Sequence, residues 1–262
     1  MLDHGLQSLY LSNPWNLLYG VPLLGGRISR RHCLGHESDF RSSHGFVEGL
    51  CGPAEGLRFW SYWTGAGLNE TAEPPISQKR LQQRRVAYFR KVVCALASPD
   101  IPLLGGYLGH ALVAKRLRAW FPEAVFVRLH RDPLSNATSI LRSRIAASSA
   151  WFSTFPKECE SVQGRGIHAE VAAQVYWLNR RLSWLREDQR TIHLSYEGLA
   201  ADPNSALQRV IEGGNACGLA LSAKGSLPNS FKYRVASPSD NADTSRLAEN
   251  LDQLESKHGP IS

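Results

Sequence analysis

Between Val125 and Arg144 a strand pattern passes directly into a helix pattern, and this junction limits the folds open to the chain. Val125 to Leu129 is a short, mostly apolar run rich in β-branched residues, which predicts a buried strand. Asp132-Pro133 then supplies a helix N-cap and a first helical residue. A strand followed at once by a helix is typical of α/β folds. The turn points free backbone N–H groups at the strand end, where an anion can bind.

Two polar side chains of this junction are suited to an anion. Arg131 offers a planar, permanently charged guanidinium that matches phosphate. Ser139 follows eight residues later on the predicted helix, with Ser135 one turn before it on the same face. Taken alone, the stretch also fits any strand-to-helix turn of an α/β protein, with Arg131 as a solvated surface charge.

A second strand-to-helix segment, from Thr191 to Pro203, reduces the number of protein families that fit the sequence. A strand at Thr191 to Leu194 leads through Tyr196-Glu197 and a short turn to another Asp-Pro helix start at Asp202-Pro203. The two segments together resemble the sulfotransferase family. The resemblance lies in the order of the motifs: Arg-Asp-Pro, a serine eight residues later, then a tyrosine-glutamate strand end followed by Asp-Pro. Members of that family transfer sulfuryl groups from 3′-phosphoadenylyl sulfate (PAPS).

The resemblance implies a nucleotide site at the carboxyl ends of the two strands. Arg131 and Ser139 would bind the 3′-phosphate of the nucleotide, and Tyr196 would contact its adenine. Lys232 and Arg234 would close over the 3′-phosphate from the final loop. A core tyrosine packed behind the sheet remains the structural alternative for Tyr196.

The acceptor side of the site is expected near the aromatic segment from Gly52 to Trp63. In the family an acidic residue precedes a Phe-Trp pair there, so the resemblance implies Glu55 as general base for an acceptor hydroxyl. Such a base requires burial that raises its pKa toward the working pH. An exposed loop glutamate is the competing interpretation. The acceptor class stays open among carbohydrates, lipid headgroups and small alcohols or amines.

Two stretches depart from the family pattern. No glycine- and serine-rich loop after a strand is found near the start of the chain, where Gly25-Gly26-Arg27 is the nearest candidate. The chain is therefore expected to begin after the family's first strand and 5′-phosphosulfate loop. Gly105, Gly106 and Tyr107 stand where a lysine is expected.

The expected fold is a three-layer α/β/α arrangement with a central parallel sheet, similar to P-loop NTPases but without the first strand and phosphate loop. A single domain is expected over residues 1–262. Helices are predicted over Ser77 to Ala97, with Leu81, Tyr88, Val92 and Leu96 as the apolar stripe, and over 168–188 and 244–255.

Composition supports an ordinary folded protein with an anionic ligand. There are 30 basic and 23 acidic side chains, a net charge of +7, which suits an anionic ligand but also nucleic acid or a membrane surface. The five cysteines show no paired or metal-like spacing, which favours buried thiols, a reducing cytoplasmic location and no metal. No signal peptide or membrane span is predicted.

Three functions follow from these observations. The first is a PAPS-dependent sulfotransferase without nucleic acid as a partner. The second is an inactive truncated relative that binds 3′-phosphorylated adenine nucleotides. The third is a basic anion- or nucleic-acid-binding protein that uses the helix predicted at 77–97.

Overall fold

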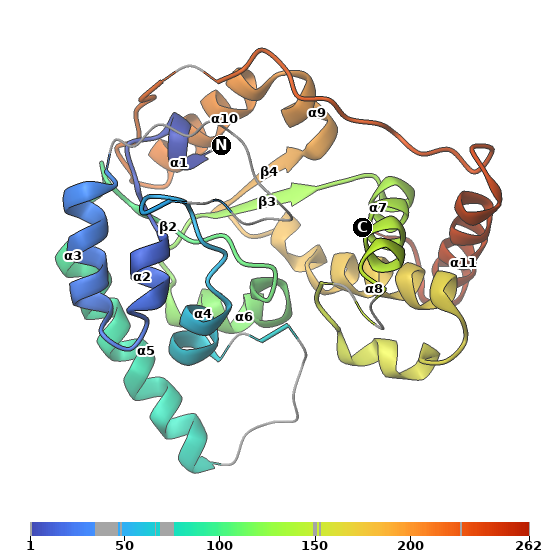
Figure 1. Cartoon of the computed structure of the whole chain (residues 1–262), viewed down its shortest axis with the longest axis horizontal. Helices are drawn as coiled ribbons and strands as arrows, with labels where there is room; N and C mark the ends of the chain where they lie inside the picture. The colour runs from blue at the N-terminus through green and yellow to red at the C-terminus, as the bar shows by residue number, and fades with distance from the viewer. Residues whose placement is uncertain are drawn as a thin grey trace.

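The fold is a mixed arrangement of short parallel strands and many helices (Figure 1). A computed structural model describes residues 2–34, 47, 49–65, 67–68, 76–148, 151, 153–225 and 227–261. The elements of the first half are α1 (Leu2–Gly5), β1 (Leu9–Tyr10), α2 (Asn13–Leu17), α3 (Pro22–His32), α4 (Leu57–Thr64), α5 (Ile76–Leu96), β2 (Leu103–Leu104) and α6 (His110–Trp120). Those of the second half are β3 (Phe126–His130), α7 (Pro133–Ala146), η1 (Lys157–Val162), α8 (Ile167–Arg181), η2 (Ser183–Arg186), β4 (Thr191–Ser195), α9 (Tyr196–Ala201), α10 (Pro203–Ala216) and α11 (Ala242–His258).

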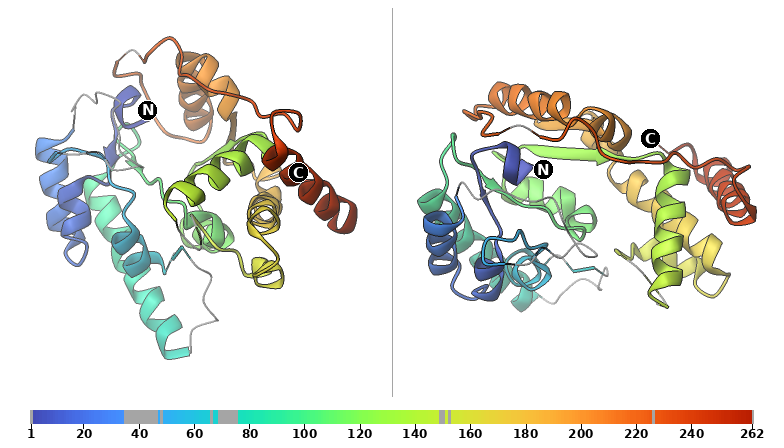
Figure 2. Two further views of the ribbon diagram at one scale, coloured as in Figure 1. Left: turned by 45° about the vertical axis from the view of Figure 1, so that its right-hand side comes forward. Right: turned by 45° about the horizontal axis from the view of Figure 1, so that its top comes forward.

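The described strands form two separate parallel pairs. β1 pairs with β2, and β3 pairs with β4 in a register that sets Leu129 beside Leu194. α10 packs over β4, and Figure 2 shows it on one side of the β3–β4 pair. The parallel pairing that the sequence predicts is thus present. A single central sheet within three layers is not confirmed among these residues.

The two halves have different cores. An aromatic core that includes Trp15, Phe59, Trp60, Trp63 and Phe89 fills the first half between α2, α3, α4 and α5. In the second half, α7, α8 and α11 pack together through buried aliphatic side chains and the fully buried Tyr176. The predicted helices at 168–188 and 244–255 correspond to α8 with η2 and to α11.

Burial along two elements differs from the sequence prediction. β3 was predicted to be buried, yet Val127 is 37% and Leu129 49% exposed. The reason is that α10 packs on Leu194 and Ile192 of β4, on the same face, and leaves the β3 side uncovered among the described residues. On α5, Val92 and Leu96 are buried as expected, whereas Leu81 and Tyr88 are exposed and Val86 and Phe89 take their places in the core.

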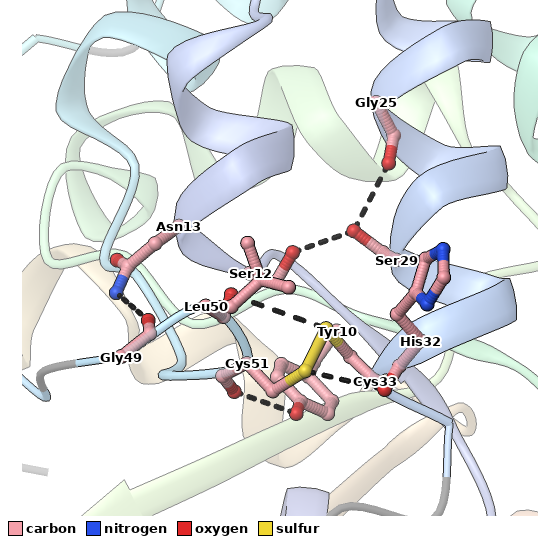
Figure 3. Close-up of a disulfide and its surroundings, with 10 residues drawn as sticks. All are labelled: Tyr10, Ser12, Asn13, Gly25, Ser29, His32, Cys33, Gly49, Leu50 and Cys51. Atoms are coloured by element: carbon pink, nitrogen blue, oxygen red, sulfur yellow. Dashed lines mark hydrogen bonds between the residues drawn. A yellow bond between two sulfur atoms is a disulfide. The ribbon is translucent and has the colours of Figure 1, made fainter.

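The cysteine prediction is wrong for one pair. Cys33, just after α3, and Cys51 form a disulfide across 18 residues of sequence (Figure 3). The Tyr10 hydroxyl donates to the Cys51 carbonyl at 2.7 Å, so β1 is held beside the bridge. Cys159 is a buried thiol as expected, and burial raises its pKa to about 12. Sequence spacing did not reveal the pair because the two cysteines meet only through the packing of α3 against β1 and the segment before α4.

Removal of this disulfide is expected to destabilise the first half of the fold. A closed loop of this length lowers the entropy of the unfolded chain by an amount worth about 3 kcal/mol. The Cys33→Ser/Cys51→Ser variant should therefore unfold at a lower urea concentration than the parent protein. Addition of a reductant should lower the midpoint of the parent but leave that of the variant unchanged. An equal midpoint for parent and variant under oxidising conditions would contradict the pairing.

Candidate anion site at the β3–α7 junction

The junction between β3 and α7 is fixed by hydrogen bonds of Asp132. The Asp132 carboxylate accepts from the Ser135 backbone N–H at 2.7 Å and from the Ser135 hydroxyl at 2.5 Å. Pro133 is the first helical residue, as the sequence predicts. The Asp132 N–H donates to Glu197 at 3.1 Å and so ties α7 to α9. The cap thus positions both the helix start and the residue before it, Arg131.

Arg131 and Tyr196 lie together at the carboxyl ends of neighbouring strands. The Arg131 guanidinium carbon is 4.6 Å from the centre of the Tyr196 ring. Tyr196 begins α9 directly after β4, whereas the sequence prediction placed it at a strand end before a turn. The Arg131 Nε is buried and has no hydrogen-bond partner among the described residues. A buried, unpaired guanidinium N–H is suited to an anion supplied by a ligand.

A cavity of about 180 Å³ opens beside Arg131, and Ser139 and Arg234 are among its lining residues. Ser135, Thr138, Ser143, Ala236 and Asp240 complete the wall together with Arg142. Its volume is below the range of pockets that enclose whole drug-sized ligands, so it suits a phosphate-sized group and part of its carrier. Lys232 is exposed and is not among the lining residues.

Arg142 is a cavity residue that the sequence analysis missed. It follows Ser139 by three positions and Ser135 by seven, so one face of α7 carries all three. The helical period therefore predicts that Arg142 lies on the same face of α7 as Ser135 and Ser139. Among the described lining residues, the three guanidinium groups of Arg131, Arg142 and Arg234 outnumber the single carboxylate, that of Asp240, which makes the cavity attractive to anions.

The segment from 231 to 241 carries Arg234 across the carboxyl end of the β3–β4 pair. It runs without helix or strand from α9 toward α11 (Figure 1). The Phe231 N–H donates to the Ala200 carbonyl at 2.7 Å, and the Ala236 N–H donates to the Ser135 hydroxyl at 2.8 Å. Arg234 also pairs with Asp240 at 3.1 Å. These contacts hold the segment at the mouth of the cavity.

His130 is the last residue of β3 and precedes Arg131, but it is not among the residues that line the cavity. Its pKa is lowered by partial burial and by the Arg128 guanidinium, while the Glu197 carboxylate opposes the shift. The imidazole is therefore neutral near pH 7 and adds no positive charge there. The guanidinium groups carry the positive field of the cavity.

Glu55 lies elsewhere, in the loop before α4. It is exposed, so the burial that the sequence prediction required is not observed, and it is not among the residues that line the cavity.

The next residue, Gly56, has φ 75°, and a Cβ there would lie 2.0 Å from Leu11, so only glycine fits. The Glu55 charge adds to burial in raising the pKa of Tyr107, whereas Ser61 opposes the shift.

The two departures from the family pattern have structural roles of their own. Gly25 and Gly26 lie inside α3, where a Cβ on either would collide with Trp15, so they do not form a phosphate loop. Gly105 lies against the Trp60 indole, with 2.8 Å from a built Cβ to Cζ2. Close packing explains glycine at these three positions.

The comparison with known families agrees with the two motifs. A model described as the sulfotransferase family matches residues 71–222, more than half of the chain. The chain belongs to the sulfotransferase family. The match contains both strand-to-helix segments of this family member, with Arg131, Ser139 and Tyr196, and ends before Lys232 and Arg234. No curated protein and no solved structure matches the chain.

Within the described ranges, no three His, Cys, Asp or Glu side chains are grouped so as to hold a metal ion. Over the same ranges, no helix combines the length and the apolar character needed to cross a bilayer.

Proposed function

We propose that this sulfotransferase takes its sulfuryl group from PAPS and that the cavity beside Arg131 binds the 3′-phosphate of that nucleotide. The support is one observation: Arg131, whose buried Nε has no described partner, lines a small cavity together with hydroxyl groups and two further arginines. Arginines and hydroxyls donate charge-assisted hydrogen bonds to phosphate oxygens. The Tyr196 ring beside Arg131 offers a flat surface on which adenine or ribose can pack.

The proposed transfer needs in-line placement of the acceptor. The acceptor oxygen or nitrogen bonds to sulfur as the bond from sulfur to the 5′-phosphate oxygen breaks, the acceptor proton passes to a base, and adenosine 3′,5′-bisphosphate leaves. In this scheme Arg131, Ser139 and Arg234 hold the nucleotide by its 3′-phosphate and thereby orient the sulfuryl group. Glu55 is the proposed base, and Lys232 is proposed to approach the nucleotide from the 231–241 segment.

Selectivity for the 3′-phosphate tests this proposal by calorimetry. Adenosine 3′,5′-bisphosphate should bind the full chain at least about tenfold more tightly than 5′-AMP, because charge-assisted hydrogen bonds contribute about 1.5–3 kcal/mol. Adenosine 2′,5′-bisphosphate is the matched control, since it has the same charge with the phosphate on the other ribose oxygen. Equal affinities for 5′-AMP and the 3′,5′-bisphosphate would contradict a 3′-phosphate site.

Binding and turnover answer separate questions. A chain that binds the bisphosphate but transfers no sulfuryl group to any acceptor would fit the nucleotide-binding alternative. Formation of adenosine 3′,5′-bisphosphate from PAPS in the presence of an acceptor would support the enzyme. The two outcomes are distinguished by giving the same chain PAPS and an acceptor and measuring the sulfated acceptor that forms.

A further inference from the structure

A second, larger cleft lies between α5, α6 and the end of α8. Its volume is about 1040 Å³, and residues of α4 and η2 complete its walls. Clefts that hold small ligands enclose about 300–1,000 Å³, so this cleft has room for more than one ring. None of its lining residues lines the cavity at Arg131.

The position of the cleft separates it from the proposed nucleotide site. Trp184 in its wall packs against Phe126, the first residue of β3, with ring centres 6.5 Å apart. Arg131 follows the last residue of the same strand. At about 3.3 Å per residue the strand spans roughly 16 Å, so the cleft lies at the opposite end of β3.

The described lining of the cleft carries six cationic residues and no Asp or Glu. They come from three helices: Lys79 and Arg85 from α5, Lys115 and Arg116 from α6, and Arg180 and Arg181 from α8. The Glu158 carboxylate, outside the lining, pairs with Arg181 at 2.7 Å and offsets one of these charges. Cationic groups on several walls of a concave site attract a ligand with negative groups at several positions.

We propose that this basic cleft binds an anionic oligosaccharide, independently of the nucleotide. Trp120 and Trp184 line the cleft, with the Arg116 guanidinium carbon 5.3 Å from the Trp120 ring centre, and amphipathic rings suit the apolar faces of sugar rings. The surrounding cations match the sulfate or carboxylate groups that such a sugar bears. The ligand class is therefore a sulfated or uronate-containing glycan.

Charge reversal on α6 tests the proposal. Lys115 and Arg116 are adjacent and exposed, so Lys115→Glu/Arg116→Glu should leave the fold intact, which the thermal midpoint checks. A sulfated, heparin-derived hexasaccharide titrated at physiological salt should bind the parent chain and lose about tenfold or more in affinity for the variant. The matched control, Arg246→Glu/Lys257→Glu on α11, makes the same charge change at exposed residues that do not line the cleft and should lose less than about twofold.

Further measurements distinguish glycan binding in the cleft from nucleotide binding at Arg131. The Arg131→Ala variant should bind the hexasaccharide as the parent does, whatever happens to nucleotide binding. An equal loss in the α11 control would overturn the cleft in favour of general electrostatic attraction. Equal affinity for a single-stranded oligonucleotide of the same charge would overturn a glycan site. Absence of hexasaccharide binding to the parent chain would also overturn it.

Discussion

Replacement of Arg131 by alanine is expected to lower the affinity for adenosine 3′,5′-bisphosphate by about 30-fold, a loss of about 2 kcal/mol. The reason is that Arg131 is partly buried, has an Nε without a partner among the described residues, and lines the small cavity. The variant would remove the charge and leave the hydroxyl groups of Ser135 and Ser139 in place. Calorimetry with the full chain measures the change directly.

A comparison of two ligands shows whether Arg131 acts on the 3′-phosphate. If it does, Arg131→Ala should bring the affinity for the bisphosphate close to that for 5′-AMP and leave 5′-AMP binding nearly unchanged. A local loss of structure would weaken both ligands together. The control is Arg246→Ala, which removes an exposed arginine from α11. A loss below about twofold for Arg131→Ala would remove the basis of the proposed nucleotide site.

Acidification is expected to destabilise the fold through His110. The ring lies 4.6 Å from Trp60 and 5.4 Å from Tyr107, and its Nε2 is buried without a described partner. Burial lowers its pKa from 6.5 to about 4. Because the unfolded chain takes up this proton at higher pH than the folded chain, stability is full above pH 6.5 and falls as the pH drops toward 4. The complete loss is about 3 kcal/mol.

Denaturant unfolding at pH 7.5 and 4.5 measures this dependence. His110→Gln should flatten the difference between the two pH values, although the variant itself is less well packed. His32→Gln is the control, since His32 is exposed at the end of α3. The expected result is a smaller pH dependence for the His110 variant alone. The same pH dependence in the parent and in His110→Gln would show that other groups govern the acid response.

The strand-to-helix junctions were predictable because their signals are local. Asp132-Pro133 and Asp202-Pro203 each cap a helix through side-chain bonds to a residue three positions on, so the sequence alone identifies the start. Arg131 and Tyr196 meet because parallel strands place their carboxyl ends at one edge. Ser139 follows from the helical period, and so does Arg142, which the sequence analysis did not use.

The features that escaped prediction depend on contacts between distant segments. The pattern of β3 indicates a strand but cannot show that α10 covers β4 and leaves Val127 and Leu129 exposed. The disulfide between Cys33 and Cys51 likewise depends on how α3 packs. The family resemblance alone implies Glu55 as a base, and the exposure of Glu55 is set by the loop before α4. The periodicity of apolar residues predicts which helix or strand forms, whereas the burial of each side chain depends on how the helices and strands pack together.

The hydrogen bond from Ala236 to Ser135 joins positions 101 residues apart. During synthesis from the N-terminus, β3 and α7 emerge long before the segment that brings Arg234 to the cavity. The anion site is therefore among the last parts of the molecule to be completed. A nascent chain halted near position 222 would hold both strands and Arg131, yet would lack one wall of the cavity.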